Sequence, residues 1–362
     1  MDIILIPSIE SHYYNFLPLL NNFENNKLIY SMLYIKSVIA DNRDFDICSE
    51  NKFVTVLENR KDAINFFDRK GTIKAVVVGN DSEPEMVHIL KYFKNNKTKI
   101  VLLQDGWLVA KNIKKPIYNH NSISNSIKKQ LHRILVSKHS PFKYNFHNFI
   151  GQNSDYFFVY SSIAKQEFIK AKVKSSNIFE TGSPRFKTFR TLPLGDQPAV
   201  LFFNTYVSGD VVKNKAILKS IDTVVRFSKE IYGNEVQIIL KCHPRDNGSA
   251  YLNISNITIH NGDIVSLITL YKPVFAFCFN STVIFELMVQ NIPFIQLMPH
   301  PFSEKDYNYQ LNLPYLKNLK SIKKKYIEAL NFDYLSNGKE LLLDVDCNFN
   351  SVAEIHHTLN QL

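Results

Sequence analysis

The sequence predicts an α/β protein made of two Rossmann-like domains, each built on a parallel sheet. Short unbroken apolar runs alternate along the chain with segments that have the apolar spacing of helices. Strands of this kind are typical of parallel sheets that are covered on both faces. The alternation restarts after residues 192–198, a stretch with two prolines and one glycine that is typical of a linker. A length of 362 residues also fits two domains.

The first domain is predicted to cover residues 1–191. Its expected strands are Ile3–Ile6, Phe53–Leu57, Lys74–Val78, Lys99–Leu103, Tyr156–Tyr160 and Ile178–Glu180. Helical spacing is present at Ala63–Phe67 and Glu85–Phe93. The loop after the first strand, with Ser8, His12 and Tyr13, is expected to contact an acceptor.

The second domain is predicted to cover residues 198–345, with a C-terminal helix in 346–362. Its expected strands are Ala199–Phe203, Val236–Leu240, Ile257–Ile259, Val274–Phe277 and Phe294–Leu297. Its expected helices are Val211–Tyr232, Ile264–Tyr271 and Thr282–Gln290. No GxGxxG follows the first strand of either domain, which disfavours a dinucleotide-dependent oxidoreductase.

The net charge of +10 is unevenly spread. No acidic residue lies between Asp105 and Asp155, and a second basic run covers Lys317–Lys325. Basic stretches with aromatic residues attract acidic glycans, nucleic acid or an anionic membrane surface. For the second run, a solvated lysine-rich face is the structural alternative.

We expect a cytoplasmic protein. The N-terminal apolar run lacks a preceding basic region and reads as a strand rather than a signal peptide, and no apolar run is long enough to span a bilayer. The cysteines have no metal-binding spacing and are predicted to be reduced and mostly buried. They are Cys48, Cys242, Cys278 and Cys347.

Polar residues follow three predicted strands, where ligands of open α/β sheets bind. Asp105, after Lys99–Leu103, is a candidate general base for an acceptor hydroxyl, and an Asp-Gly turn is the structural alternative. His243 follows Val236–Leu240 and lies between Lys241 and Arg245, which suits a phosphate ligand. Pro244 holds the histidine backbone extended, and a purely structural histidine is the alternative.

The third position is Asn280-Ser281-Thr282, before the helix that contains Glu286. Hydroxyls and free backbone N–H groups there favour an anion, or they serve only as a helix cap. Glu286 is expected either to contact a sugar hydroxyl or to be a surface residue. Asn204 and Gly182 complete the set of expected donor-binding residues. The DxD spacings at Asp44–Asp46 and Asp344–Asp346 are interpreted as chance, so no metal site is predicted.

This order of motifs resembles that of bacterial sialyltransferases, in which an acidic-acidic-Gly motif supplies the base and His-Pro and Ser-Ser/Thr bind the CMP phosphate. Gln104 stands where that motif has its first acidic residue. The skeleton also resembles capsule Kdo transferases and CDP-glycerol glycerophosphotransferases, which carry a Gly-x-Pro-Arg element like Gly182–Arg185. The resemblance implies a GT-B fold with a central cleft, a cytidine-nucleotide donor, and no requirement for a metal or other cofactor.

The resemblance also implies a mechanism. Asp105 would deprotonate the acceptor, while His243, Lys241, Ser281 and Thr282 would stabilise the departing CMP phosphate, so that sialic acid or a related nonulosonic acid is transferred with inversion. The expected acceptor is a bacterial surface glycan, free or lipid-linked. The basic segment 111–149 would hold it or contact the inner membrane. No nucleic-acid partner is expected.

Three other functions stay open at this point. CMP-Kdo or CDP-glycerol is the alternative donor. A sugar-nucleotide epimerase shares the two-domain shape. A non-enzymatic polyanion-binding protein would use the basic segment alone, with the strand-end residues acting as caps.

Overall fold

A computed structural model describes most of the chain and divides it into two compact units. Unit 1 contains residues 1–185 and 348–362, and unit 2 contains residues 186–347. The described residues are 2–20, 28–39, 53–82, 84–106, 108, 150–205, 211–243, 246, 248, 251–252, 254–279, 281–302 and 311–362.

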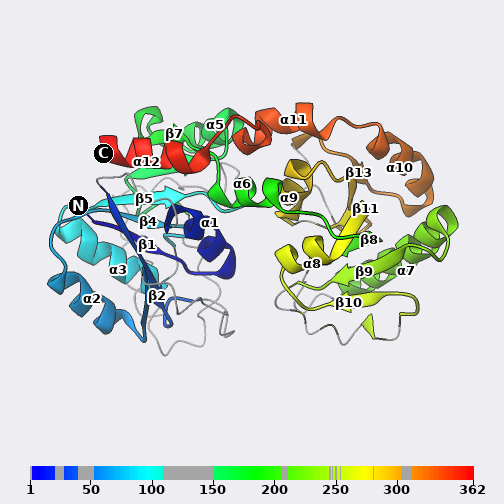
Figure 1. Ribbon diagram of the computed structural model, residues 1–362, viewed down its shortest axis with the longest axis horizontal. Helices are drawn as coiled ribbons and strands as arrows, with labels where there is room; N and C mark the ends of the chain where they lie inside the picture. Colours follow the sequence, from blue (N-terminus) through cyan, green and yellow to red (C-terminus); the bar gives the residue numbers. More distant parts are fainter. Residues whose placement is uncertain are drawn as a thin grey trace, which may run out of the picture. The chain divides into compact units, whose positions relative to one another are not determined.

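Within the described residues, unit 1 has a seven-stranded sheet in the order β3-β2-β1-β4-β5-β6-β7 (Figure 1). All of its pairings are parallel. The strands are β1 (Asp2–Ile6), β2 (Ile29–Ile35), β3 (Val54–Leu57), β4 (Ile73–Val78), β5 (Lys99–Leu103), β6 (Tyr156–Val159) and β7 (Ile178–Glu180). The helices are α1 (Glu10–Leu20), α2 (Arg60–Arg69), α3 (Pro84–Asn95), α5 (Ser162–Lys170) and α12 (Ser351–Gln361).

In the described part of unit 2, six parallel strands run in the order β10-β9-β8-β11-β12-β13. The strands are β8 (Gln197–Phe203), β9 (Gln237–Lys241), β10 (Thr258–His260), β11 (Tyr271–Cys278), β12 (Phe294–Leu297) and β13 (Tyr315–Leu316). The helices are α7 (Val211–Tyr232), α8 (Ile264–Leu270), α9 (Val283–Val289), α10 (Ile322–Leu330) and α11 (Tyr334–Leu341). Helix α6 (Pro184–Thr191) contains the point where the chain passes from unit 1 to unit 2.

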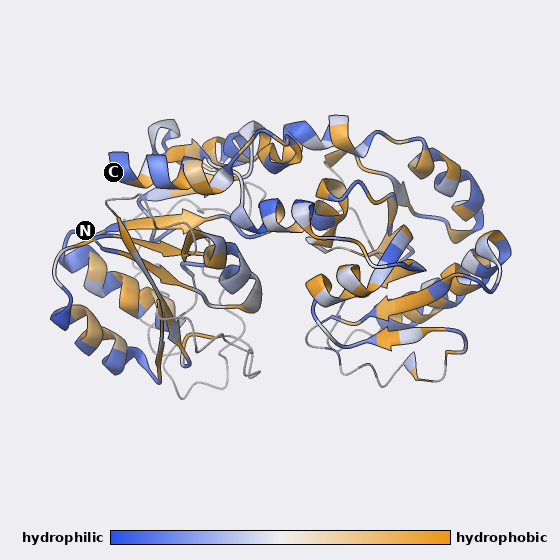
Figure 2. Ribbon diagram, viewed as in Figure 1, coloured by the Kyte–Doolittle hydropathy of each residue, from blue (hydrophilic) through white to orange (hydrophobic). Residues whose placement is uncertain are grey.

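Each unit buries its own apolar core on its sheet, whose strands are mostly orange in Figure 2. In unit 1, Phe16 of α1 and Ile355 of α12 pack in one cluster with Ile3, Val101 and Phe158 of the sheet. The final helix therefore completes the first unit, although it is distant in sequence. The hydroxyl of Tyr30 also lies 2.6 Å from Nδ1 of His356 on α12.

These sheets confirm the prediction of two Rossmann-like parallel-sheet domains. One prediction is wrong, because the segment after β1 is a helix rather than a loop and His12 and Tyr13 lie in α1. Pro18 argues against a helix in the sequence because it has no backbone N–H to donate to the preceding turn, but it lies in the last turn of α1. Within the described residues, no helix combines the length and the apolar character needed to cross a membrane.

The strand order of each unit reverses once, between β1 and β4 in unit 1 and between β8 and β11 in unit 2. Such switch points leave a crevice beyond the carboxyl ends of the strands, and ligands of open α/β sheets bind there. Six of the predicted site residues lie at or after the carboxyl ends of strands at or beside these two points: Asp105, Asn204, Lys241, His243, Ser281 and Thr282.

Candidate active site

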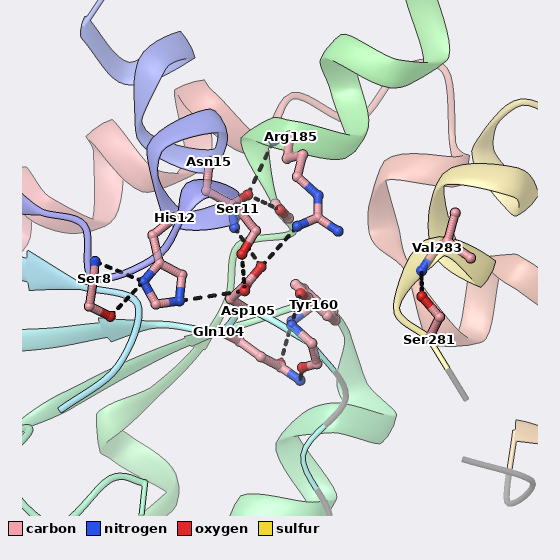
Figure 3. A network of polar contacts seen from close by, with 12 residues as sticks. Ser8, Ser11, His12, Asn15, Gln104, Asp105, Tyr160, Arg185, Ser281 and Val283 are labelled. Atoms are coloured by element: carbon pink, nitrogen blue, oxygen red, sulfur yellow. Dashed lines mark hydrogen bonds and ion pairs between the residues drawn. The ribbon is translucent and has the colours of Figure 1, made fainter. Parts of the chain in front are cut away.

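Asp105 follows β5 in unit 1 and is surrounded by donors from α1 and α6 (Figure 3). The Ser11 hydroxyl donates to Oδ2 at 2.6 Å. Nη1 of Arg185 donates to Oδ1 at 3.0 Å, and Nδ2 of Asn15 donates to the same oxygen at 3.3 Å. Because these partners are side chains, the carboxylate does not serve as the cap of an Asp-Gly turn.

The turn around Asp105 is held by Gln104 and Tyr160 instead. The Gln104 amide accepts from Tyr160 N at 3.2 Å and donates to Gly106 O at 3.0 Å. Gly106 N donates to Tyr160 Oη at 2.7 Å, and Gly106 has a φ of 80° that favours glycine. An ionised glutamate at position 104 could not donate to Gly106 O. The Gln104 amide therefore gives this turn a hydrogen bond that an ionised acid would not make.

His12 lies between Ser8 and Asp105. Ser8 N donates to Nδ1 of His12 at 3.2 Å, and Nε2 lies 3.4 Å from Asp105 Oδ2. Since a backbone N–H only donates, the proton of the neutral ring is on Nε2 and faces the carboxylate. The ring lies against Gly79, where an added Cβ would come within 2.3 Å of His12 Cδ2. Glycine after β4 therefore leaves the space that the imidazole occupies.

The surroundings of Asp105 keep it ionised. Burial by itself raises the pKa of the Asp105 carboxyl, but the hydrogen bond from His12, the charge of Arg185 and the Ser11 hydroxyl together outweigh burial and hold that pKa well below its usual range. The side chains of Arg185 and Asp105 are only 7% and 10% exposed. The pair is therefore a largely desolvated ion pair with a fixed geometry.

The Gly182–Arg185 turn belongs to this cluster. Gly182 has a φ of 67°, and its N–H donates to Val159 O at the end of β6. Ser183 then donates to Asn15 Oδ1 at 2.5 Å. Gly182 was predicted from the sequence as a site residue, but Ser11, Asn15 and Arg185 were not. Arg185 could have been predicted from the Gly-x-Pro-Arg resemblance.

In unit 2, Asn204 follows β8 and its side-chain amide has a fixed orientation. Nδ2 of Asn204 donates to Tyr251 Oη at 2.5 Å and to Asp246 Oδ2 at 3.2 Å. Oδ1 therefore points away from these groups. It is buried without a hydrogen-bond partner, and the residue is 4% exposed. A buried acceptor of this kind is costly unless a donor reaches it.

Lys241 is the last residue of β9, the neighbour of β8, and His243 follows that strand. Lys241 O accepts from Asn204 N at 3.0 Å, and His243 O accepts from Asp246 N at 2.8 Å. Both side chains are half-buried, and Nζ of Lys241 donates to Cys242 O at 3.2 Å. The structure thus places Lys241 and His243 beside Asn204, while Pro244 and Arg245 lie outside the described residues.

Ser281 and Thr282 follow β11, on the other side of the switch point from Asn204. Ser281 Oγ accepts from Val283 N at 3.3 Å, and Thr282 makes no side-chain cap to α9. Glu286 is 3% exposed, so its interpretation as a surface residue is wrong. The roles of these residues toward a ligand stay predictions, and Asn280 lies outside the described residues.

The remaining predicted features have structural roles where they are described. Carbonyl oxygens of Asp344 and Asp346 accept from Nη1 of Arg190. Among the described residues, no three His, Cys, Asp or Glu side chains form a metal-binding group. Cys242 and Cys278 are buried free thiols and Cys347 is an exposed one. Asp44, Asp46, Cys48 and the basic segment 111–149 lie outside the described residues.

Comparison with solved structures identifies the fold. No family model and no curated protein match the chain. The UDP-GlcNAc 2-epimerase of Methanocaldococcus jannaschii matches 100% of both chains with a TM-score of 0.60 and 15% identity. The S. aureus MnaA–UDP structure matches 100% of this chain and 97% of its own, at a TM-score of 0.59 and 13% identity.

The wall teichoic acid polymerase TagF matches 99% of this chain and 88% of its own, at a TM-score of 0.56 and 14% identity. The fold is GT-B. This confirms the predicted fold class, with two parallel-sheet α/β units, while identities this low carry nothing finer than the fold.

Proposed function

We propose that this chain is an inverting, metal-independent glycosyltransferase that moves sialic acid or a related nonulosonic acid from a CMP donor to a bacterial surface glycan. The observation that carries the proposal is the ionised Asp105, fixed by Arg185, His12 and Ser11 at the carboxyl edge of the unit 1 sheet. Its position suits an acceptor hydroxyl. The residues beyond β8, β9 and β11 suit an anionic donor.

Asp105 would take the proton of the acceptor hydroxyl. In the resting state its donors make it a weak base, so transfer of the proton becomes favourable only as the acceptor oxygen bonds the anomeric carbon and loses its own affinity for the proton. The Ser11 hydroxyl, 2.6 Å from Oδ2, marks the place that an acceptor hydroxyl would take. His12 and Arg185 would position the carboxylate.

Unit 2 would bind the donor. Asn204 Oδ1 is a buried acceptor without a partner, and it would receive a hydrogen bond from the nucleotide or the sugar. Lys241 and His243 would offset the negative charge that develops on the CMP phosphate as it departs. Ser281 and Thr282 would add hydroxyl donors. From the resemblance, Pro244, Arg245, Asn280, Glu286 and Gly182 would complete the binding site.

The identity of the donor sugar is the most specific part of the proposal. CMP-Kdo and CDP-glycerol remain the alternative donors. CMP-Kdo would react by the same displacement at the anomeric carbon, whereas with CDP-glycerol the acceptor oxygen would attack phosphorus and CMP would leave. The basic segment 111–149, rich in lysine and free of acidic residues, would hold an acidic glycan acceptor or lie at the inner membrane surface.

The experiment that tests the proposal is nucleotide release with EDTA present, in which CMP-sialic acid, CMP-Kdo and CDP-glycerol are offered in parallel. Wild type is compared with Asp105→Asn and His243→Ala, and an enzyme-free blank corrects for spontaneous hydrolysis. We expect turnover of CMP-sialic acid that falls at least about 100-fold in both variants. Release that is equal in wild type and both variants would refute the assigned roles, and release from none of the donors would refute the cytidine-nucleotide donor.

A sugar-nucleotide epimerase is the second candidate, favoured by the match in fold over the full length of the M. jannaschii UDP-GlcNAc 2-epimerase. An epimerase would convert UDP-GlcNAc to its C2 epimer without an acceptor. Incubation with UDP-GlcNAc followed by NMR of the nucleotide sugar separates the two functions. The transferase proposal predicts no conversion.

A further inference from the structure

Unit 2 exposes a basic and apolar surface that the proposed site does not use. We call it the α10 surface. It extends from β13 over a short 3-10 helix (Leu319–Ser321) to α10 (Figure 2). It consists of Tyr315, Lys317, Lys320, Lys323, Lys324, Lys325, Ile327 and Leu330. The opposite face of α10 is anchored in the core, where Ile322 and Ala329 are buried.

The apolar part of the α10 surface is exposed to solvent. Ile327 is 59% exposed and Leu330 is 48% exposed. Residues three apart are neighbours on a helix, so these two side chains form one patch. Lys323 and Lys324, four and three residues before Ile327, lie one helical turn from it on α10. Exposed isoleucine and leucine side chains on a basic face indicate a partner that has a negatively charged outer layer and an apolar layer beneath it.

An exposed aromatic ring extends the surface. Tyr315 is 37% exposed. Nζ of Lys317 lies 5.6 Å from the centre of its ring and Nζ of Lys325 lies 5.9 Å from it. This contact brings the loop after β13 and α10 together. A tyrosine beside lysines is the residue type that gathers at a membrane–water interface.

The charge of the surface is positive after its acidic neighbours are counted. Lys323 pairs with Glu230 of α7, and Lys325 pairs with Glu328. The five lysines therefore face two glutamates, and Lys320 and Lys324 are exposed. An anionic partner gains from this excess of positive charge.

We propose that the α10 surface docks on an anionic lipid bilayer. Phosphate headgroups would contact Lys320 and Lys324 while Ile327 and Leu330 insert at the boundary between headgroups and acyl chains. A soluble acidic glycan or nucleic acid offers the charge but gives Ile327 and Leu330 no apolar partner. None of its residues belongs to segment 111–149, and docking needs no nucleotide sugar.

The test is co-sedimentation of the full chain with vesicles of phosphatidylglycerol and phosphatidylcholine, and with phosphatidylcholine alone, at physiological salt. The variants are Lys320→Gln with Lys324→Gln, and Ile327→Ser with Leu330→Ser. The matched control is Lys61→Gln with Lys94→Gln, which removes two exposed lysines from α2 and α3. Melting temperatures and CMP release on soluble donors are expected to be unchanged in all three.

We expect wild type to bind the anionic vesicles more tightly than the neutral ones. Loss of Lys320 and Lys324 should weaken binding roughly 25-fold, and loss of the two apolar side chains roughly ten-fold, while the control binds like wild type. Binding that matches the control in either variant would overturn the proposal. A second pattern would also overturn the proposal: the lysine variant loses binding to soluble polysialic acid, while the Ile327 and Leu330 variant binds vesicles like wild type. That pattern would indicate a glycan-binding site.

Discussion

Asp105→Asn is the substitution whose cost follows most directly from the structure. It keeps the shape of the side chain but removes the negative charge 3.0 Å from Nη1 of Arg185. The two side chains are 10% and 7% exposed, and removing one partner of such a buried pair costs roughly 3–5 kcal/mol of folding free energy. The new amide also turns its NH₂ toward the Nε2–H of His12 or toward Arg185. We therefore expect a cost in the upper part of that range.

The assay is urea unfolding followed by circular dichroism, with Asp222→Asn as the matched control. Asp222 pairs with Arg226 at 2.9 Å on α7, but these side chains are 61% and 73% exposed. The same substitution there should cost only about 0.5 kcal/mol. If Asp105→Asn costs no more than Asp222→Asn, the carboxylate is not the desolvated partner of Arg185 and the reasoning about its pKa fails.

The pH dependence of the unfolding free energy tests the same contribution of ionised Asp105. The pKa of Asp105 is lowered in the folded chain, so its ionised form contributes stability that is fully present above the ordinary carboxyl value of about 4. That contribution is lost as pH falls through the folded pKa. The difference in unfolding free energy between wild type and Asp105→Asn should therefore be full at neutral pH and shrink only in strong acid. A difference that already shrinks near pH 6 would contradict this.

Three further predictions concern activity and binding. With Asp105 as proton acceptor and its pKa lowered, kcat/KM should not fall as pH is lowered from 8 to about 5. An acidic limb near 6.5, the ordinary imidazole value, would assign the proton to a histidine. Gly79→Ala places a methyl group against His12 and should lower kcat/KM roughly ten-fold or more. The control Gly71→Ala has nothing within 4 Å of the added Cβ and should leave kcat/KM unchanged. Equal kcat/KM values in the two variants would contradict the placement of His12. Asn204→Ala should weaken CMP binding in calorimetry about ten-fold, and unchanged affinity would remove Asn204 from the donor site.

The fold was predictable because buried parallel strands leave a strong local pattern. Lys99–Leu103, Val211–Tyr232 and Phe294–Leu297 have the predicted bounds. The failures were local as well. Helix α1, which contains Pro18, and the apolar run Ile29–Ile35, which forms β2, were not predicted. The return of α12 to unit 1 depends on packing between residues far apart in sequence, which no local pattern contains.

The candidate site was predictable only at its centre. The position of Asp105 after a strand was predictable because the apolar run Lys99–Leu103 is visible in the sequence. His12 was expected near the acceptor, but Ser11 and Arg185 were not named, because they are 94 and 80 residues from Asp105 and meet it only in the folded unit. Glu286 shows the same limit, since its burial depends on tertiary packing and not on its place in a helix.

The most direct test of the proposed transfer is a single mixture of wild-type protein, CMP-sialic acid, UDP-GlcNAc and a pooled bacterial surface-glycan extract, followed by NMR against an enzyme-free blank. The transferase account predicts that CMP accumulates, that sialic acid becomes glycan-linked with inverted anomeric configuration, and that UDP-GlcNAc is unchanged. Conversion of UDP-GlcNAc to its C2 epimer with CMP-sialic acid left intact would contradict it.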